Sequence, residues 1–527
     1  MRAGATISAD VPAPAPSPVP GPVPAREGVR WAVVLAVVLT AVLEVLDSTI
    51  VNVALPHMRA TFGITADQTT WILTSYIVAS VVVMPLTGLF VSRFGRRRLI
   101  LSAIVGFMGF SALCGLARSV EWIVACRIGQ GAFGAFLIPL SQSILFDSFP
   151  REKRGQAMAL FGLGVVVAPI LGPTLGAILT ESFSWRAVFY VNVPVASFAL
   201  LMMGGELRRT ETRDVPIDWT GLLLMAGAIA ALQVTLDLGE TRDWFASHLI
   251  QVAALVAAAA GIAFVLRGAR RADNIIDLSL FRDRSFAAAN GAMLGFGLAM
   301  FGTIAVLPIF VQGLLGYGVL DAGYLFMPRG LAAGTSMVLT GAVLLRRFDP
   351  RLLVAAGLLL TGTGNLALGR LDLDAGFWDL ARPGVISGLG MGLFFVPMST
   401  VAFQNIGPDR QDEASGIYGL FRSLGSSVGI ALVGWQLATR TQVHWAVLSG
   451  AITPFDAAAR AYLAPLGLAP GTAEGAAALA GPLAAQAQML AFADAFTLTG
   501  WAAYAMLPAI LFMARPRPGA SAAPAGH

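Results

Sequence analysis

Apolar blocks of about 20 residues alternate with short polar segments along most of this chain. A block of this length crosses about 30 Å of hydrocarbon when it forms a helix. The pattern therefore predicts an all-α polytopic membrane protein. We expect fourteen transmembrane helices, at about residues 31–53, 71–91, 98–117, 121–142, 157–180, 186–204, 217–236, 248–266, 286–312, 322–345, 352–369, 383–405, 415–437 and 496–513.

The composition agrees with this pattern and excludes other classes of protein. Of the 527 residues, 56% are hydrophobic and 12% are charged, about half the charged share of a soluble domain. The net charge of +5 comes from short arginine clusters between apolar blocks, so we expect no nucleic-acid partner. Cys114 and Cys126 lie in apolar blocks and the four histidines are scattered. We therefore predict no metal site, no cofactor and no enzyme activity, because no catalytic cluster is present.

The basic residues predict the orientation. If the N-terminus is cytoplasmic, 24 of the 35 Lys and Arg residues fall in inward segments and eight in outward loops. Cytoplasmic loops of membrane proteins are enriched in Lys and Arg. We therefore expect both termini to be cytoplasmic. The remaining three, Arg127, Arg329 and Arg422, fall inside predicted helices.

An internal repeat predicts the domain organisation. The segment GLFVSRFGRRRL (88–99), after the second helix, matches GAVLLRRFDPRL (341–352), after the tenth. Helices 1–6 then correspond to helices 9–14, as two six-helix bundles around a central cavity, and helices 7 and 8 are inserted. At one constant offset the aligned pairs are Gly88 with Gly341, Arg93 with Arg346, and Arg98 with Arg351.

The expected division of the chain follows from this repeat. It comprises a disordered, Pro/Ala-rich cytoplasmic tail (1–30), an N-terminal bundle (31–204), the inserted helices with cytoplasmic linkers (205–285), a C-terminal bundle (286–514) that includes a periplasmic loop (438–495), and a cytoplasmic tail (515–527).

Several segments, in the same order, resemble those of a known family. They are LDSTIVNVALP (46–56), GLFVSRFGRRR (88–98), RIGQGAFGAFLIPLSQS (127–143), APILGPTLGA (168–177), WRAVFYVNVPV (185–195) and FRSLGSSVG (421–429). The chain resembles the major facilitator superfamily, and within it the fourteen-helix drug:proton antiporters of the EmrB/QacA type. The resemblance implies a multi-pass protein of the inner (plasma) membrane that exports hydrophobic or cationic compounds in exchange for protons. It also implies a periplasmic adaptor and an outer-membrane channel as partners in Gram-negative relatives.

Two motifs have a physical interpretation beside the one that the family implies. APILGPTLGA places two glycines four residues apart, which allows close helix packing, and two prolines that bend the helix. The resemblance assigns it to antiporters, where it limits leak; its residues are Pro169, Gly172, Pro173 and Gly176. The loop after the second helix carries a turn glycine and basic side chains, namely Gly88, Arg93, Gly95, Arg96, Arg97 and Arg98. An Asp that latches the bundles commonly precedes its first Arg in the family, but this position is Ser92 here.

Charges within the membrane are the strongest indication of function, because burying one costs about 3 kcal/mol or more unless it is paired. Glu44 and Asp47 are three residues apart in the first helix and so share a face. We hypothesise that Asp47 is the coupling carboxylate and that Glu44 assists it or binds a cationic substrate. Alternatively, Asp47 caps or bonds a neighbouring helix. Arg127, which matches the family, either tunes the carboxylate or forms a structural salt bridge.

Other polar and aromatic residues are candidates to line a substrate cavity, with plain packing as the alternative for each. They are Gln130, Phe133, Phe136, Gln142, Gln404, Asn405, Arg329 and Arg422. The outward stretch 438–495 has apolar residues at helical spacing, which predicts short amphipathic helices that either dock an adaptor or cap the outer vestibule. Asp494 is expected to cap the last helix.

The leading functional hypothesis is a proton-coupled multidrug exporter. The main alternative is a dedicated exporter of one endogenous metabolite, lipid or antibiotic. ATP-driven transport is excluded because the chain lacks the P-loop GxxxxGK[ST].

Overall fold

A computed structural model of the chain describes residues 31–150, 153–203, 212, 217–270 and 276–513. The tails expected at 1–30 and 515–527, and parts of the linkers beside the inserted helices, lie outside the described residues. Within the described part, every regular element is a helix.

The helices follow the order expected from the apolar blocks. The first half contains α1 (Trp31–Phe62), α2 (Ala66–Val83), α3 (Thr87–Phe94), α4 (Arg96–Gly115), α5 (Val120–Gly134), α6 (Leu137–Ser148), α7 (Arg154–Ser182), α8 (Ala187–Tyr190) and α9 (Asn192–Met203). The inserted pair is α10 (Trp219–Leu238) and α11 (His248–Arg270). The second half contains α12 (Arg284–Pro308), α13 (Val319–Leu339), α14 (Leu345–Arg347), α15 (Pro350–Leu368), α16 (Phe377–Phe403), α17 (Gln411–Ala451), α18 (Ala457–Leu463) and α19 (Ala473–Ala505).

Most of these helices have the length and hydropathy of membrane spans. Across the described residues, 11 helices pass both criteria, and α7 makes a twelfth although it bends by 43° next to Pro169. A proline removes a backbone donor, which explains a bend at this place. The shorter apolar segment Ala187–Met203 and α13 complete the series, which is consistent with the fourteen expected spans.

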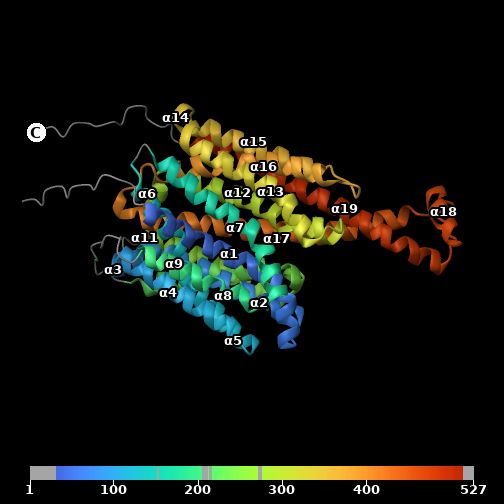
Figure 1. Cartoon of the computed structure of the whole chain (residues 1–527), viewed down its shortest axis with the longest axis horizontal. Coiled ribbons are helices and arrows are strands. Elements are labelled where there is room, and N and C mark those ends of the chain that lie inside the picture. The colour runs from blue at the N-terminus through green and yellow to red at the C-terminus, as the bar shows by residue number, and fades with distance from the viewer. Residues whose placement is uncertain (1–30, 151–152, 204–211, 213–216, 271–275, 514–527) are drawn as a thin grey trace, which may run out of the picture.

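The two halves repeat the same packing, as the sequence repeat predicted. Helix α1 packs against α7 and α9, and α12 packs in the same way against α17 and α19. Likewise α5 packs against α2 and α4, and α16 packs against α13 and α15. Figure 1 shows the two bundles one above the other, with the first half below and α13, α15 and α16 above.

The inserted helices lie at the edge of the contact between the bundles. Helix α10 packs against α2 of the first bundle and α17 of the second, and α11 packs against α10. An ion pair of 2.7 Å between Asp218 and Arg267 joins the two inserted helices. Only 6% of the apolar window of α11 is buried, so this helix faces lipid.

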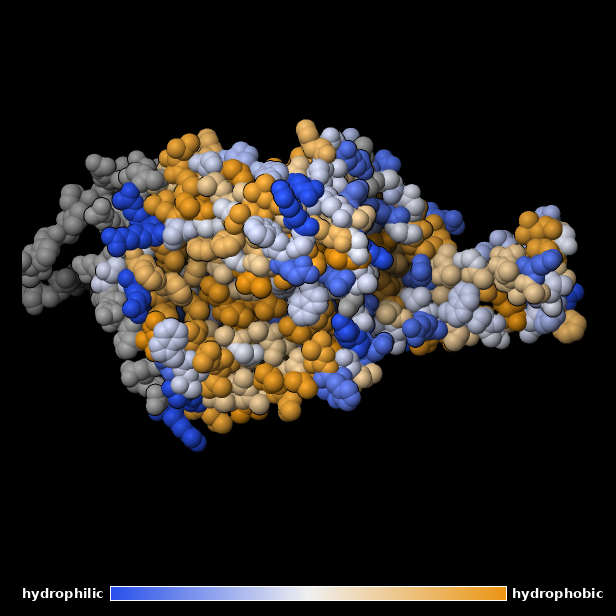
Figure 2. Space-filling view, turned by 90° about the horizontal axis from the view of Figure 1, so that it is seen from below, coloured by the Kyte–Doolittle hydropathy of each residue, from blue (hydrophilic) through white to orange (hydrophobic). Residues whose placement is uncertain are grey.

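The face of the body that Figure 2 shows is predominantly apolar between two more hydrophilic ends. The short helices α3 and α14, which carry Arg93 and Arg346, lie at the end opposite α18 (Figure 1). The basic loops thus gather at one end of the molecule. This arrangement is consistent with the predicted orientation, in which that end is cytoplasmic.

The stretch 438–495 differs from the short amphipathic helices that the sequence predicted. Helix α17 continues to Ala451 and α19 already begins at Ala473, so both extend beyond the body as a paired stalk that ends in α18 (Figure 1). The many alanines between residues 473 and 495 explain the early start of α19, because alanine has the highest helix propensity. Asp494 is no cap: it lies inside α19, with its Oδ2 2.9 Å from Nε2 of His444 in α17.

Candidate functional site

Asp47 forms a fully buried ion pair inside the N-terminal bundle. Its Oδ2 lies 2.6 Å from Nη1 of Arg127, and both side chains are 0% exposed. Its Oδ1 accepts hydrogen bonds from Nδ2 of Asn192 at 2.6 Å and from Nε2 of Gln130 at 2.9 Å. Helices α5 and α9 therefore bring three donors to one carboxylate of α1. Such a set supplies a counter-charge and hydrogen bonds in a place where an unpaired charge would be costly.

The helices around Asp47 also hold the guanidinium of Arg127. Its Nη1 donates to Oε1 of Gln130 at 2.8 Å, and its Nε donates to the carbonyl of Ile72 in α2 at 3.2 Å. Its carbon Cζ lies 4.0 Å from the ring centroid of Tyr76, a cation–π contact. Every one of these groups belongs to the N-terminal bundle. The pair of Asp47 and Arg127 is thus part of the rigid interior of one bundle.

Glu44 occupies a different environment from Asp47, although the two share a face of α1. The side chain of Glu44 is 8% exposed and interacts electrostatically with Arg422 in α17. Arg422 is itself 8% exposed. Since α17 belongs to the second bundle, this interaction connects the two halves of the molecule. Of the candidate coupling residues, Glu44 is the one whose surroundings change if the bundles move apart.

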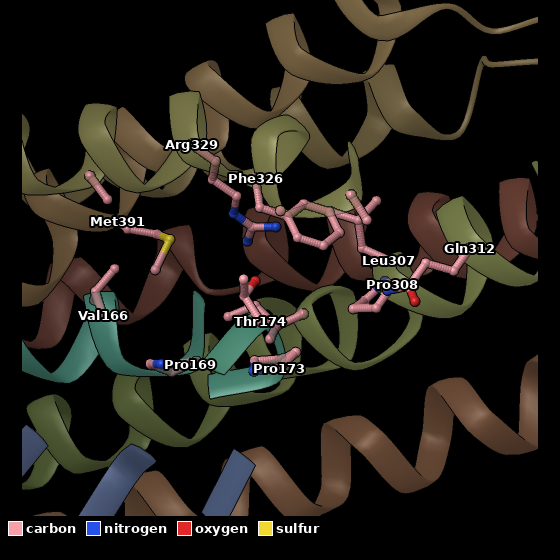
Figure 3. Close-up of a pocket in the computed structure, with 14 residues that line it drawn as sticks. Val166, Pro169, Pro173, Thr174, Leu307, Pro308, Gln312, Phe326, Arg329 and Met391 are labelled. Carbon is pink, nitrogen blue, oxygen red and sulfur yellow. The ribbon is translucent and has the colours of Figure 1, made fainter. Parts of the chain in front are cut away.

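The glycines and the prolines of the antiporter motif have different surroundings. In α7, Gly172 lies against Thr49, and a Cβ added to Gly176 would come within 2.8 Å of the carbonyl of Ile50. These glycines therefore let α7 approach α1 closely. Pro169 and Pro173 instead line a cavity between the bundles (Figure 3).

That cavity has a volume of about 60 Å³. Its walls come from α7 in the first bundle and from α12, α13 and α16 in the second. Apolar residues such as Leu307, Phe326 and Met391 form most of it. Among the described residues, Arg329 is the one basic residue in its lining. Of the residues that the sequence proposed for a substrate cavity, Arg329 thus lines this cavity between the bundles.

Arg96, in the loop motif, links the two bundles at the predicted cytoplasmic end. Its Nη1 lies 2.7 Å from Oδ2 of Asp147, at the end of α6. Its Nη2 and Nε lie 2.9 Å and 3.0 Å from Oδ2 of Asp412, in the first turn of α17. Although Ser92 replaces the acidic residue of the motif, Asp412 pairs with Arg96 between the bundles, and Asp147 pairs with it within the first bundle.

The remaining residues of the loop motif fit this arrangement. A Cβ added to Gly88 would come within 2.5 Å of the Cβ of Glu413, so glycine is required for close packing of α3 against α17. Gly95 has a φ of +80°, which favours glycine, and it ends α3. The side chains of Arg93 and Arg98 are exposed, and that of Arg97 is half-buried.

The other candidates for a substrate cavity pack within the protein. Phe133 stacks on Phe110 at 5.8 Å between ring centroids, and Phe136 contacts Phe90 at 5.2 Å. Gln142 is 2% exposed in α6.

Two further candidates lie where α16 ends. The side chain of Asn405 donates to Oδ2 of Asp283 at 2.9 Å, and that of Gln404 donates to Ser285 at 3.4 Å. Asp283 caps the first turn of α12. Gln404 and Asn405 therefore connect α16 to the start of α12.

Sequence reasoning missed three residues that complete these sites. Asn192 lies within the quoted segment WRAVFYVNVPV, where an amide in an apolar span is a detectable signal. Asp147 and Asp412 lie in the loops predicted after the fourth and twelfth helices, where acidic residues are common, so nothing distinguished them in the sequence.

The fold and these sites define the class of protein: a secondary transporter of two six-helix bundles. The model of the Major Facilitator Superfamily matches residues 37–430. The chain therefore belongs to the Major Facilitator Superfamily, and it is a multi-pass protein of the inner membrane.

Its relatives place it more closely, beside the EmrB export proteins. It is 33% identical over 426 residues to the multidrug export protein EmrB of Haemophilus influenzae, covering 80% of this chain and 83% of that protein. It is 33% identical over 432 residues to EmrB of Escherichia coli, covering 80% and 83%. It is 35% identical over 418 residues to the fatty acid resistance protein FarB of Neisseria gonorrhoeae, covering 79% and 82%.

Solved structures show the same fold at low identity. A bacterial homologue of the human lysosomal transporter Spinster, in an inward-facing and unoccupied conformation, superimposes with a TM-score of 0.57 and 18% identity, covering 94% of this chain and 100% of that one. The proton:xylose symporter XylE gives a TM-score of 0.55 and 16% identity, covering 91% and 96%. These similarities support the fold alone.

Proposed function

We propose that this protein is a proton-coupled multidrug efflux transporter, which exports hydrophobic or cationic compounds by alternating access in exchange for protons. The relatives named multidrug export proteins support export, and the antiporter motif on α7 supports exchange. The observation that carries the proposal is the pair of carboxylates on α1. One of them is fixed inside a bundle, and the other faces an arginine of the opposite bundle.

In this proposal Glu44 carries the proton, and Asp47 holds Glu44 in position. These roles are the reverse of those hypothesised from the sequence. Arg422 stabilises the ionised form of Glu44 while the two bundles are close together. When α17 moves away, the buried charge of Glu44 loses its partner, and binding a proton removes the cost. Asp47 and Arg127 stay paired throughout, because both belong to the same bundle. Their ion pair keeps the face of α1 that carries Glu44 in a fixed orientation.

Two variants test this division of roles in inverted vesicles that carry a proton gradient. Glu44→Gln removes the titratable group without removing a bond that Asp47 makes, so drug-induced proton release should be abolished. Its loss of stability should be smaller than that of Asp47→Asn, because Glu44 interacts with Arg422 only electrostatically, whereas Asp47 forms a direct ion pair. Asp47→Asn should abolish release as well, but with a loss of stability, because Arg127 then lacks its counter-charge. Unchanged release in both variants would refute coupling at α1.

A dedicated exporter of one endogenous compound remains the second candidate. Two observations favour it: the relative FarB is named for fatty acid resistance, and the cavity of about 60 Å³ is small. Drug-susceptibility profiles of a deletion strain, with and without a protonophore, separate the two. A profile that is unchanged across hydrophobic cations, uncouplers and antibiotics would support the dedicated exporter.

We further propose that the stalk binds a periplasmic adaptor, which connects the transporter to an outer-membrane channel. Helix α17 has 41 residues, or about 60 Å, so it extends well beyond a bilayer core of about 30 Å. At the tip, Leu463 and Leu479 form a small core, while Phe455 is 82% exposed and Tyr462 is 50% exposed. An exposed apolar patch is typical of a protein-binding surface, and we propose that these two aromatic residues belong to the surface that contacts the adaptor.

The matched variants Phe455→Ser and Tyr462→Ser should weaken cross-linking to the adaptor and leave drug-induced proton release by the isolated transporter unchanged. Unchanged cross-linking would contradict this role of the stalk.

A further inference from the structure

The three arginines that the sequence placed inside membrane spans differ in their partners. Arg127 is paired with Asp47 at 2.6 Å, and Arg422 interacts electrostatically with Glu44. Arg329 is 7% exposed. In the described part of the chain, its guanidinium makes no ion pair and no hydrogen bond with another residue. A buried arginine normally has an acidic or carbonyl partner, because a buried unpaired charge is costly.

The free side of this guanidinium faces the cavity between the bundles. Figure 3 shows the side chain of Arg329 extending from α13 toward Thr174 of α7, with Phe326 beside it. Apart from Arg329, the polar side chains in the lining are those of Thr174 and Gln312. The cavity thus combines one positive charge, a hydroxyl and an amide with walls that are otherwise apolar.

We propose that Arg329 binds the carboxylate of lipophilic organic acids, whose charged end and adjoining methylene groups occupy this cavity. The inference rests on the proposed export function and names a substrate class for it, in addition to the cationic compounds. A carboxylate accepts two parallel hydrogen bonds from a guanidinium. It would supply the counter-charge that Arg127 and Arg422 obtain from acidic residues of the protein.

The charges around the cavity select a carboxylate among the possible anions. Arg329 contributes one positive charge, and no other basic residue lines the cavity within the described part of the chain. A monoanion is therefore neutralised, whereas a phosphate with two charges would leave one of them unpaired in apolar surroundings. A lipophilic cation would meet the charge of Arg329 without a compensating carboxylate.

The position of the cavity connects binding to transport. Its lining includes Pro169, Pro173 and Thr174 on α7, next to the bend of that helix, and Arg329 on α13 of the opposite bundle. A bound acid would contact both halves at once. Movement of one bundle against the other would then break these contacts, which is what release of an exported substrate requires.

The test compares two ligands of equal chain length, decanoate and decyltrimethylammonium, on the full-length protein in nanodiscs. Binding of the labelled compounds is measured by scintillation proximity for wild type, Arg329→Gln, Arg329→Lys and the control Arg370→Gln, whose side chain is exposed in an outward loop. We expect Arg329→Gln to weaken decanoate binding about tenfold or more. Arg329→Lys should retain part of the affinity. Binding of the cation should be unchanged or tighter in both, and the control should match wild type.

Equal decanoate affinity in wild type and Arg329→Gln would overturn the proposal, as would an equal loss for both ligands. Should Arg329→Gln fail to fold, Gly323→Val provides the second test. Its Cβ would lie 3.2 Å from Oγ1 of Thr174, so it narrows the cavity and keeps the charge. It should weaken decanoate binding, and unchanged binding would again overturn the proposal. Proton-driven transport is measured separately in vesicles, so a wild-type protein that binds decanoate but transports nothing would refute the export function and leave this site intact.

Discussion

The buried pair of Asp47 and Arg127 gives the most quantitative prediction for stability. Asp47→Ala removes the carboxylate that accepts bonds from Arg127, Gln130 and Asn192. The guanidinium then remains fully buried without a counter-charge. Breaking a buried ion pair in this way typically costs about 3–5 kcal/mol. This corresponds to a loss of about two to three and a half orders of magnitude in the ratio of folded to unfolded protein.

The double variant Asp47→Ala with Arg127→Met separates lost pairing from lost packing. Replacing both charges with apolar groups removes the buried charge, so most of the lost stability should return. The free energy of unfolding is measured by titration with SDS, followed by circular dichroism. The control is Asp277→Asn, which breaks the pair with Arg410 at the surface and should cost less than about 1 kcal/mol.

Two results would refute this reasoning. One is a loss in the free energy of unfolding for Asp47→Ala as small as that of the surface control, since a buried charge without a partner destabilises a protein much more than a broken surface pair does. The other is a double variant that is as unstable as the single one, because the loss would then come from packing rather than from charge.

Three further predictions concern packing, the latch and pH. Gly176→Leu should prevent α7 from packing on α1 and abolish folded protein in size-exclusion chromatography, whereas Gly109→Leu, with no atom within 4 Å of its added Cβ, should fold. Asp412→Asn should weaken the ion pair of Arg96 between the bundles. Labelling of a cysteine introduced between the bundles at the cytoplasmic end should then increase, and unchanged labelling would contradict the role of this ion pair as a latch. Partial burial raises the pKa of Asp277, but hydrogen bonds from Ser279 and the charge of Arg410 outweigh it and lower the pKa overall. The stabilising contribution of ionised Asp277 should therefore be lost only as the pH falls through that lowered pKa. At that pH the thermal unfolding temperatures of wild type and Asp277→Asn should converge.

The fold was predictable because its main signals are local. Apolar blocks of membrane length and the repeat around Gly88 and Gly341 specify two bundles, and the packing of corresponding helices confirms them. The extent of α17 and α19 was not predictable in the same way. Both helices continue from the membrane into the stalk without a break. Hydropathy predicts where the apolar segment ends, but not where the helix ends.

The site was predictable in its residues but not in their pairing. The sequence singled out Glu44, Asp47 and Arg127 because charges within the membrane are rare. It did not show that Asp47 pairs within one bundle while Glu44 faces the other, since this depends on which side of α1 meets α5 and which meets α17. The partners of Arg96 were hidden for a similar reason: Asp147 and Asp412 are distant in sequence and meet only when the bundles pack together.

The most direct test of the account is proton release from inverted vesicles when a drug is added, compared between wild type and Glu44→Gln at equal protein levels. The account predicts release by wild type and none by Glu44→Gln, with drug binding retained and a smaller loss in the free energy of unfolding than Asp47→Asn causes. Release by Glu44→Gln at the wild-type rate would show that the proton moves elsewhere and would contradict the central claim.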